Sequence, residues 1–391
     1  MNNVTCIILA GGKGTRLYPL TKNRAKPAVT FGGRIKLIDI PIHLAKTAKI
    51  EDIYILTQYL ASSIHEHIDA HYMEDKIELI CPNKQENIVF EGTADAIRKN
   101  LHIFEPLDTE YFLVLSGDHV YDFDFKKFID YGIEKNADML VMCKPVNKTQ
   151  ANRLGILQID PEYQISNFVE KPQDPNLIET LLVPDTEEVL GSMGIYLFKK
   201  ETLINLLQED QREDFGKHLI PSQIKKGKSF AYAYDGYWED IGTIKTFFQT
   251  SLDLTKKDFN LKKKLLSKNF YHLPKPTICT QKLQNSIICE GTKIEAQEIK
   301  NTILGIGSVV KKGSLIKDSI ILGSHELDKG SIIGENCMIK NTIIDQNVNI
   351  GNNVELLNKN NLSEYEDSNL LIKDGIIVVK ENASIPDGFS I

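Results

Sequence analysis

The sequence predicts an α/β domain with a mixed, mostly parallel sheet, followed by a parallel β-helix. Two patterns carry this prediction. Short apolar segments alternate with helical segments as far as about residue 254, and apolar residues then recur every six positions. At 391 residues the chain is too long for one ordinary hydrophobic core. We therefore expect a first domain over residues 1–255, a linker over 256–282 and the β-helix over 283–391.

The first domain is expected to alternate strands and helices. Apolar runs typical of buried strands occupy residues 4–9, 53–56, 111–115 and 139–143, and helical patterns occupy residues 94–101 and 125–135. Because ligands of such sheets bind beyond the carboxyl ends of the strands, residues that follow a strand are the first candidates for a site.

The C-terminal part repeats with a period of six, which fits neither a helix nor a simple strand but the hexapeptide repeat of a β-helix. We expect corners at Gly307, Gly313, Gly334 and Gly351, and protruding loops where the period breaks, near residues 325–327 and over 358–374. The apolar positions with this spacing are Leu304, Val310, Ile316, Leu322, Ile332, Met338, Ile344, Ile350, Leu356, Val379, Ile385 and Ile391.

Composition narrows the class of protein. A net charge of −7 argues against a surface for nucleic acid, and no apolar stretch reaches the roughly 20 residues that span a bilayer. The six cysteines form no Cys-x-x-Cys pair, so no zinc or dithiol site is indicated. The first strand begins almost at the first residue, and we expect a cytoplasmic protein without a signal peptide.

A glycine-rich turn follows the first strand. Gly11, Gly12 and Gly14 allow a sharp bend and a close approach of the backbone to a ligand, and successive N–H groups in such a turn bind anions. Arg16 and Lys26 follow within the same stretch. The turn has neither the P-loop pattern nor a third glycine of a dinucleotide-binding loop. The cations favour a polyphosphate, most simply a nucleoside triphosphate.

The segment Leu9-Ala10-Gly11-Gly12-Lys13-Gly14-Thr15-Arg16-Leu17, followed by Arg24-Ala25-Lys26-Pro27-Ala28, resembles the signature of the sugar-nucleotide pyrophosphorylase family. The resemblance covers nearly the whole chain, in the order of the family. Its further segments are Thr57-Gln58-Tyr59, Gly92-Thr93-Ala94-Asp95-Ala96, Ser116-Gly117-Asp118-His119, Phe168-Val169-Glu170-Lys171-Pro172, Ser192-Met193-Gly194-Ile195-Tyr196, Asp214-Phe215-Gly216-Lys217 and Trp238-Glu239-Asp240-Ile241-Gly242-Thr243.

This resemblance implies a Rossmann-like nucleotidyltransferase domain and a left-handed β-helix. It also implies nucleotidyl transfer, in which a sugar 1-phosphate attacks the α-phosphorus of a nucleoside triphosphate and pyrophosphate leaves. The later segments are most similar to the adenylyl branch, which implies ATP and glucose 1-phosphate as substrates, Mg²⁺ as cofactor and ADP-glucose as product. The oligomer implied is a homotetramer, or a heterotetramer with a paralogous subunit.

The resemblance also assigns roles to residues, all by matching of motifs. Arg16 and Lys26 are expected to hold the triphosphate and, with the metal ligands Asp118 and Asp240, to be the catalytic residues. The nucleotide site implied is Leu9, Ala10, Gly11, Gly12, Gly14, Thr15, Arg16, Lys26, Gln58, Gly92 and Thr93, and the sugar-phosphate site implied is Gly155, Glu170, Lys171, Ser192 and Asp214. An ion pair between the adjacent Glu170 and Lys171 is not expected.

Three alternatives stay open at this stage. Another base or sugar specificity, such as UTP, dTTP, GTP or mannose 1-phosphate, is the nearest, and a catalytically silent regulatory subunit is the second. The presence of Arg16, Asp118, Lys171 and Asp240 argues against the silent subunit. The third is an acyltransferase site on the β-helix, which requires a histidine there, and only His325 is available.

The tail also resembles the plant and cyanobacterial branch, in which two lysines help to bind 3-phosphoglycerate. Here those two positions hold Gln346 and Glu381, and Asn23 replaces a lysine of the branch that responds to fructose 1,6-bisphosphate. We expect weak activation, or none, by either effector. A shifted site that uses Lys22, Lys373 or Lys380 is the alternative.

Overall fold

The computed structural model describes residues 3–82, 89–256, 273–280, 282–324 and 330–391. The chain divides into two compact units. The first comprises Met1–Gly12 and Ile40–Trp238, and the second comprises Lys13–Asp39 and Glu239–Ile391. Within the described ranges, no helix combines the length and the apolar character that a bilayer crossing needs.

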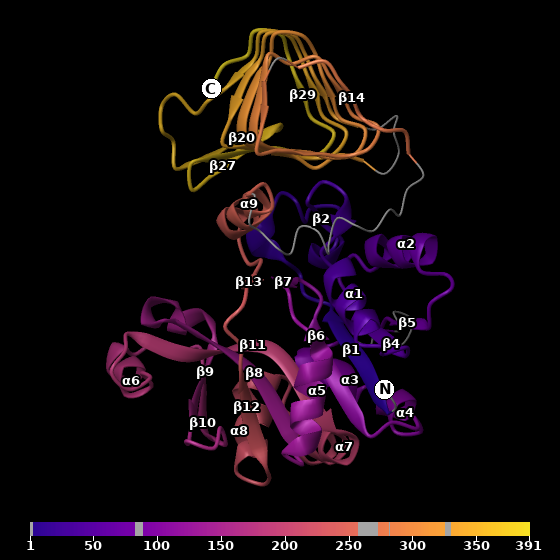
Figure 1. Cartoon of the computed structure of the whole chain (residues 1–391), viewed down its shortest axis with the longest axis vertical. Coiled ribbons are helices and arrows are strands. Elements are labelled where there is room, and N and C mark those ends of the chain that lie inside the picture. The colour runs from indigo at the N-terminus through magenta and orange to yellow at the C-terminus, as the bar shows by residue number, and fades with distance from the viewer. Residues whose placement is uncertain (1–2, 83–88, 257–272, 281, 325–329) are drawn as a thin grey trace. The chain divides into compact units, whose positions relative to one another are not determined.

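The first unit is built on a nine-stranded mixed sheet, with β10-β9-β11-β6-β1-β4-β5 as its main path; β8 also pairs with β11, and β12 pairs with β8 (Figure 1). The neighbours of β1 and β4 are parallel, whereas β11 is antiparallel to β6 and β8. The strands are β1 Val4–Ala10, β4 Ile53–Thr57, β5 Ile77–Ile80, β6 Tyr111–Ser116, β8 Met139–Asn147, β9 Gly155–Ile159, β10 Ile165–Glu170, β11 Glu188–Lys199 and β12 Ser229–Ala233. The four strands predicted from apolar runs are confirmed as β1, β4, β6 and β8.

Helices connect these strands and cover the sheet (Figure 1). The helix predicted over 125–135 is confirmed as α5, which Asp124 caps. The helix predicted over 94–101 is shorter, because the chain leaves helical geometry at Asn100 and a separate turn follows. The helices are α1 Asp39–Thr47, α2 Ser62–His71, α3 Thr93–Arg98, α4 Leu101–Phe104, α5 Phe125–Glu134, α6 Pro175–Thr180, α7 Lys200–Glu209 and α8 Ile220–Ile224, with short turns η4 Lys148–Arg153 and η5 Phe215–Leu219.

The second unit contains the predicted parallel β-helix, whose stacked coils are visible in Figure 1. The long strands β18 and β20 bend at Asn301 and Asp318, both with positive φ, so that each forms two sides of a coil. The strands are β14 Thr277–Ile278, β15 Lys282–Gln284, β16 Ile287–Ile288, β17 Lys293–Ile294, β18 Glu298–Leu304, β19 Val309–Val310, β20 Leu315–Ile321, β21 Ile332–Ile333, β22 Met338–Lys340, β23 Thr342–Ile344, β24 Asn349–Ile350, β25 Glu355–Leu356, β28 Ile376–Val379 and β29 Ser384–Ile385.

Asparagine forms more of the corners than the sequence pattern indicated. Gly307 and Gly313 have positive φ as expected, whereas Gly334 and Gly351 do not. Asparagine tolerates the left-handed conformation, and its amide can bond to the next coil, as Asn301 Nδ2 does to Asp318 Oδ1 at 2.9 Å. The asparagines with positive φ in this region are Asn285, Asn301, Asn336, Asn341, Asn347, Asn353, Asn358, Asn361 and Asn382.

One interruption of the period is more ordered than the protruding loop that was predicted. Within residues 358–374 the chain forms β26 Glu364–Glu366 and β27 Leu370–Lys373, which pair antiparallel, and β27 also pairs antiparallel with β28. The break therefore extends a face of the β-helix by a hairpin. The other predicted loop, near residues 325–327, lies outside the described residues, as does most of the predicted linker.

The second unit also includes an N-terminal segment, Lys13–Asp39, which we call the phosphate segment because it carries Arg16 and Lys26. Its backbone joins the β-helix directly, since Ile306 N donates to Gly33 O at 3.1 Å. Phe31 packs edge-on against Phe247 of α9, with ring centroids 6.4 Å apart. Its elements are η1 Thr15–Leu17, η2 Lys26–Ala28, β2 Thr30–Phe31 and β3 Ile35–Lys36, and the unit also contains α9 Ile244–Asp253.

Candidate active site

The glycine-rich turn begins where β1 ends, at Leu9 and Ala10, and leads into η1 at Thr15. Gly14 has φ of +62°, and a Cβ there would lie 2.9 Å from the Cβ of Lys26. Gly14 is therefore required both by its conformation and by the close approach of Lys26. The turn is closed by Thr21, whose hydroxyl donates to Gly14 O at 3.0 Å.

Lys26 meets the last residue of β13, Trp238–Asp240, and Arg16 meets the segment that follows this strand. Lys26 is only 8% exposed, and its Nζ lies 3.4 Å from Asp240 Oδ1. The guanidinium of Arg16 lies over Gly242, with Nη2 3.5 Å from the position of a Cβ there. The second unit thus brings together both predicted triphosphate ligands and one predicted metal ligand, and Lys26 and Asp240 are 214 positions apart in the sequence.

Asp118 lies in the turn between β6 and β7, His119–Tyr121. Its Oδ1 accepts a hydrogen bond from Ser116 Oγ and lies 3.5 Å from His119 Nε2. The His119 ring packs edge-on against Trp238, with centroids 5.6 Å apart. A Cβ at Gly194, which has φ of +67°, would lie 3.3 Å from His119 Cε1. Trp238 and Gly194, which belong to two of the motifs that resemble the family, therefore both lie next to His119.

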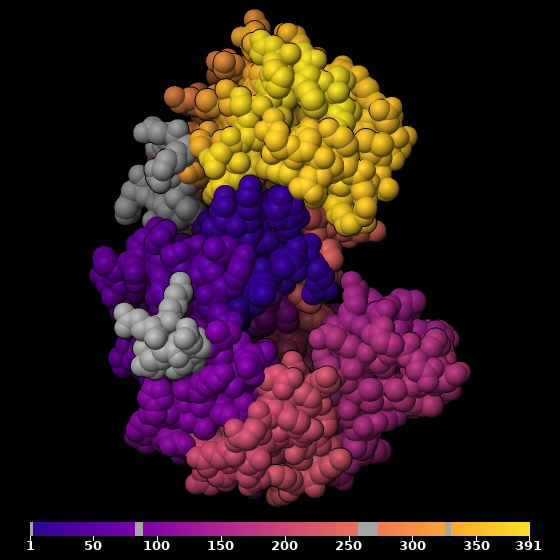
Figure 2. All heavy atoms as spheres, turned by 180° about the vertical axis from the view of Figure 1, so that it is seen from behind, coloured from indigo at the N-terminus to yellow at the C-terminus, as the bar shows by residue number. Residues whose placement is uncertain are grey.

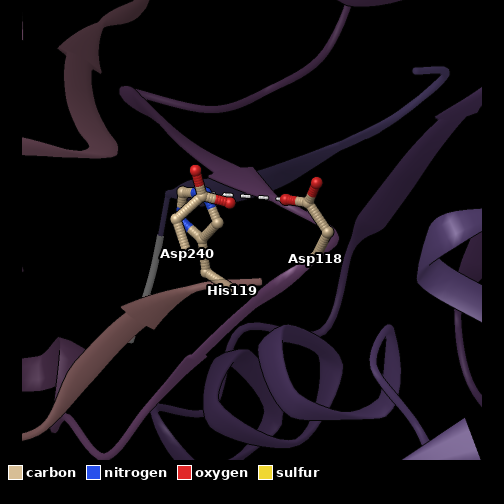
Figure 3. A group of neighbouring side chains, drawn as sticks. All are labelled: Asp118, His119 and Asp240. Carbon is tan, nitrogen blue, oxygen red and sulfur yellow. Dashed lines mark ion pairs between the residues drawn. The ribbon is translucent and has the colours of Figure 1, made fainter. Parts of the chain in front are cut away.

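The paired strands β7 and β13, with the turn just before β7, carry the group of metal-type ligands that Figure 3 shows. The ligand atoms of Asp118, His119 and Asp240 all lie within 4.8 Å of one another. Two carboxylates offer the oxygen ligands that hard divalent cations prefer, so these residues fit such an ion. Sequence reasoning identified both aspartates but assigned no role to His119, although the residue stood in the quoted motif.

Gln58 and Gly92 are two predicted nucleotide residues of the first unit, and both lie close to the backbone of another segment. The Gln58 amide pairs with the backbone of Phe90, accepting at 2.5 Å and donating at 3.1 Å. A Cβ at Gly11 would lie 3.3 Å from Gln58 Cβ. A Cβ at Gly92 would lie 2.3 Å from Glu213 O, so only glycine fits there.

Thr93 connects this nucleotide set to the predicted sugar-phosphate set. Its hydroxyl accepts from Phe215 N at 3.2 Å, next to Asp214. Asp214 itself caps η5 by accepting from Lys217 N at 2.9 Å. The two sets of residues, which the sequence presents as separate motifs, are thus neighbours in the first unit.

Glu170 is the centre of the sugar-phosphate set. It ends β10 and pairs with Gly155, the first residue of β9. A Cβ at Gly155 would lie 2.8 Å from Glu170 Oε2, and a Cβ at Gly216 would lie 2.4 Å from the same atom. Two glycines therefore make room for this carboxylate. Gly216 was not among the predicted site residues, and only its neighbour Asp214 pointed to it.

Lys171 forms an ion pair with Glu170, with Nζ 2.8 Å from Oε1, which contradicts the sequence-based expectation for adjacent residues. The positive φ of Lys171, 47°, turns its side chain back toward its neighbour. Lys171 is more than half exposed, whereas Glu170 is largely covered. The carboxylate is thus held in place, and the paired ammonium is exposed on the surface of the first unit.

Ser192, the remaining predicted sugar residue, is buried in β11, where its Oγ accepts from Gly194 N at 3.3 Å. A hydrogen bond also links it to Tyr196, whose pKa is raised above its ordinary value because the phenol is fully buried. Ser192 therefore supports the backbone that passes His119, and its contacts connect the sugar set with the metal-type ligands.

Two family models together match most of the chain. The Nucleotidyl transferase family matches residues 5–257, and the GLGC left-handed parallel beta-helix domain matches residues 271–390. The chain belongs to the nucleotidyl transferase family. A nucleotidyl transferase domain followed by this β-helix is the hallmark architecture of glucose-1-phosphate adenylyltransferase, the enzyme class that makes ADP-glucose. Members of the family generally use a divalent metal.

Proposed function

We propose that the chain makes ADP-glucose and pyrophosphate from ATP and glucose 1-phosphate with Mg²⁺, for α-glucan synthesis of the glycogen or starch type. The observation that most supports the proposal is the convergence of Lys26 and Arg16 on Asp240 and Gly242. Cations that bind a triphosphate and a carboxylate that binds a metal belong together in nucleotidyl transfer, because the phosphates and the ion share charge.

In the proposed reaction a phosphate oxygen of glucose 1-phosphate forms a bond to the α-phosphorus of ATP. The bond from that phosphorus to the bridging oxygen breaks, and pyrophosphate leaves with the electron pair. No general base is needed, because a phosphate dianion is already a nucleophile. The work of the protein is therefore positioning and charge neutralisation.

Lys26 and Arg16 bind the β- and γ-phosphates and stabilise the charge that develops on pyrophosphate. Asp118 and Asp240 hold Mg²⁺, which when bound neutralises phosphate oxygens. Lys171 binds the sugar phosphate, and Glu170, fixed between Gly155 and Gly216, accepts hydrogen bonds from sugar hydroxyls. Gln58 and Gly92 line the nucleobase side together with the glycine-rich turn.

A panel of triphosphates and sugar 1-phosphates tests the specificity. We expect pyrophosphate release to be at least tenfold faster with ATP than with UTP, dTTP or GTP, and to require glucose 1-phosphate. A tenfold preference for another base would reject the adenylyl assignment. Absence of turnover with every pair would favour a silent regulatory subunit.

We further propose a cytoplasmic homotetramer. All six cysteines are free, and four of them are buried, which is consistent with a reducing compartment.

The tetramer is tested by light scattering on the purified protein, which reports the mass directly. A monomeric active species would reject the tetramer.

A further inference from the structure

Arg24 is a buried cation that joins the phosphate segment to the last coils of the β-helix. Its side chain is 7% exposed, and its guanidinium bonds two carboxylates at once. Nη1 lies 2.8 Å from Asp345 Oδ1, and Nη2 lies 2.7 Å from Glu381 Oε1. Asp345 follows β23 and Glu381 lies just after β28, and these two strands are paired neighbours. One arginine therefore bridges adjacent coils.

Further contacts connect the phosphate segment to the same coils. Asn23 Nδ2 donates to Glu381 Oε2 at 2.8 Å, and Gln346 Nε2 donates to Thr30 Oγ1 at 3.2 Å. Tyr18 donates to Glu366 of the β26–β27 hairpin at 2.9 Å. Figure 2 shows atoms of the N-terminal part, in indigo, directly against those of the last coils, in yellow. The phosphate segment is therefore hydrogen-bonded to the β-helix both before and after Arg24 in the sequence.

Buried ion pairs contribute little net stability compared with apolar packing of the same volume, but a bidentate arginine restricts the positions of the groups that it joins. Here the fork of Arg24 has a separate carboxylate for each terminal nitrogen. Removal of one carboxylate would leave a buried cation partly unpaired. The cluster is thus suited to set the position of the backbone at Arg24.

Lys26 follows Arg24 after a single residue, so its position depends on that backbone. Ala25 accepts from Ala28 N at 2.9 Å, and Pro27 fixes the turn η2 between them. Lys26 then lies against Gly14 on one side and points to Asp240 on the other. Because this stretch is short and hydrogen-bonded, a displacement of Arg24 would move Lys26.

We propose that Arg24 is a positioning residue for Lys26, held in place by Asp345 and Glu381 of the β-helix. Because these two carboxylates pair with Arg24 from within the chain, the phosphate segment keeps the position that places Lys26 without a bound anion. We call Asp345 and Glu381 the anchor. The proposal rests on the proposed function, because it assigns Lys26 to the triphosphate.

Glu381→Gln and Glu381→Ala test the proposal in the full-length protein, because Glu381 is partly exposed and its loss is less damaging to folding than loss of Arg24. We expect kcat to fall at least fivefold, with the KM for glucose 1-phosphate within twofold of the wild type. Arg24→Lys should retain more activity than Arg24→Gln. The double variant Arg24→Gln with Glu381→Gln should be no slower than Arg24→Gln alone.

Rescue by a small carboxylate separates positioning from a general loss of structure. Acetate at tens of millimolar should restore at least half of the activity that Glu381→Ala loses and should not help Arg24→Gln. The matched control is Glu355→Gln, which removes an ion pair with Lys359 elsewhere on the β-helix. It should keep wild-type kcat.

Two results would overturn the proposal. One is kcat within twofold of the wild type in both Glu381 variants. The other is a loss that acetate leaves unchanged and that follows a lowered Tm. The proposed function is tested separately, and it is rejected if the wild-type protein makes no ADP-glucose. Calorimetric titration with ATP then still tests the anchor, which requires weaker ATP binding in the Glu381 variants than in Glu355→Gln.

Discussion

Lys26 Nζ lies 3.4 Å from Asp240 Oδ1, within one compact unit that also contains the β-helix. A lysine that is expected to bind the triphosphate is therefore paired with an aspartate that is expected to bind the metal. The pair compensates two charges, of which the Lys26 ammonium is largely covered and the Asp240 carboxylate is 36% exposed. The proposed function predicts that each partner exchanges the other for a ligand of opposite charge when triphosphate and metal bind.

Replacement of Lys26 by Gln should lower kcat by about 10²-fold or more, because a buried charge aimed at the leaving group is lost. The KM for glucose 1-phosphate should change little. Steady-state rates decide this, with Lys22→Gln, an exposed lysine of the same segment, as the matched control. Similar losses in both variants would contradict a specific role for Lys26.

Replacement of Asp118 by Asn should also lower kcat by about 10²-fold or more, through weaker retention of the divalent ion. The concentration of Mg²⁺ that gives half-maximal rate should rise. A magnesium titration at saturating substrates measures both effects. An unchanged magnesium requirement would show that Asp118 is not a ligand.

Replacement of Lys171 by Gln should raise the KM for glucose 1-phosphate by at least tenfold and change kcat less. The ammonium holds the sugar phosphate in the ground state and in the transition state alike, so its loss mainly removes binding. Initial rates over a range of glucose 1-phosphate test this. The role is misassigned if saturation by the sugar phosphate is unaffected.

We expect neither 3-phosphoglycerate nor fructose 1,6-bisphosphate at millimolar levels to change the rate by more than twofold. Glu381 is already bound to Arg24 and Asn23, and Lys380 and Lys373 are paired with Glu366 and Glu364. An incoming anion would meet carboxylates instead of free cations. Initial rates at subsaturating ATP provide the test, and a several-fold rise with 3-phosphoglycerate would contradict it.

Lys36 makes stability depend on pH. Its buried ammonium donates to Thr30 Oγ1 at 3.1 Å, and burial, with Arg24 nearby, lowers its pKa from 10.5 to about 7 against the opposing charges of Asp39, Asp345 and Glu381. Between these pKa values the unfolded chain keeps a proton that the folded chain has lost. The contribution of Lys36 to stability therefore rises with pH through that window.

Lys36→Met should remove this dependence. Denaturant unfolding at pH 7 and pH 9.5 should show the wild type gaining on the order of 2 kcal/mol more than the variant between the two conditions. Equal gains in the two proteins would show that Lys36 stays protonated in the fold.

The sequence was most informative where a local pattern is sufficient. Apolar runs located β1, β4, β6 and β8, and the period of six located the β-helix, because each pattern reports burial of nearby residues. The predicted corners were all glycines, so the corners that asparagine forms were missed.

Pairings between distant segments could not be predicted in this way. Arg24 and Asp345 are 321 positions apart, and nothing local to either indicates the other. The contacts between the phosphate segment and the β-helix likewise join distant parts of the sequence. The roles of His119 and Gly216 likewise depend on neighbours that only the fold supplies.

The central claim is attack by glucose 1-phosphate on the α-phosphorus of ATP. Mass spectrometry of the products, formed from glucose 1-phosphate with ¹⁸O in its non-bridging phosphate oxygens, tests it most directly. We predict ADP-glucose that retains all of the label, and unlabelled pyrophosphate. Label in the pyrophosphate, or a labelled product other than ADP-glucose, would contradict the account.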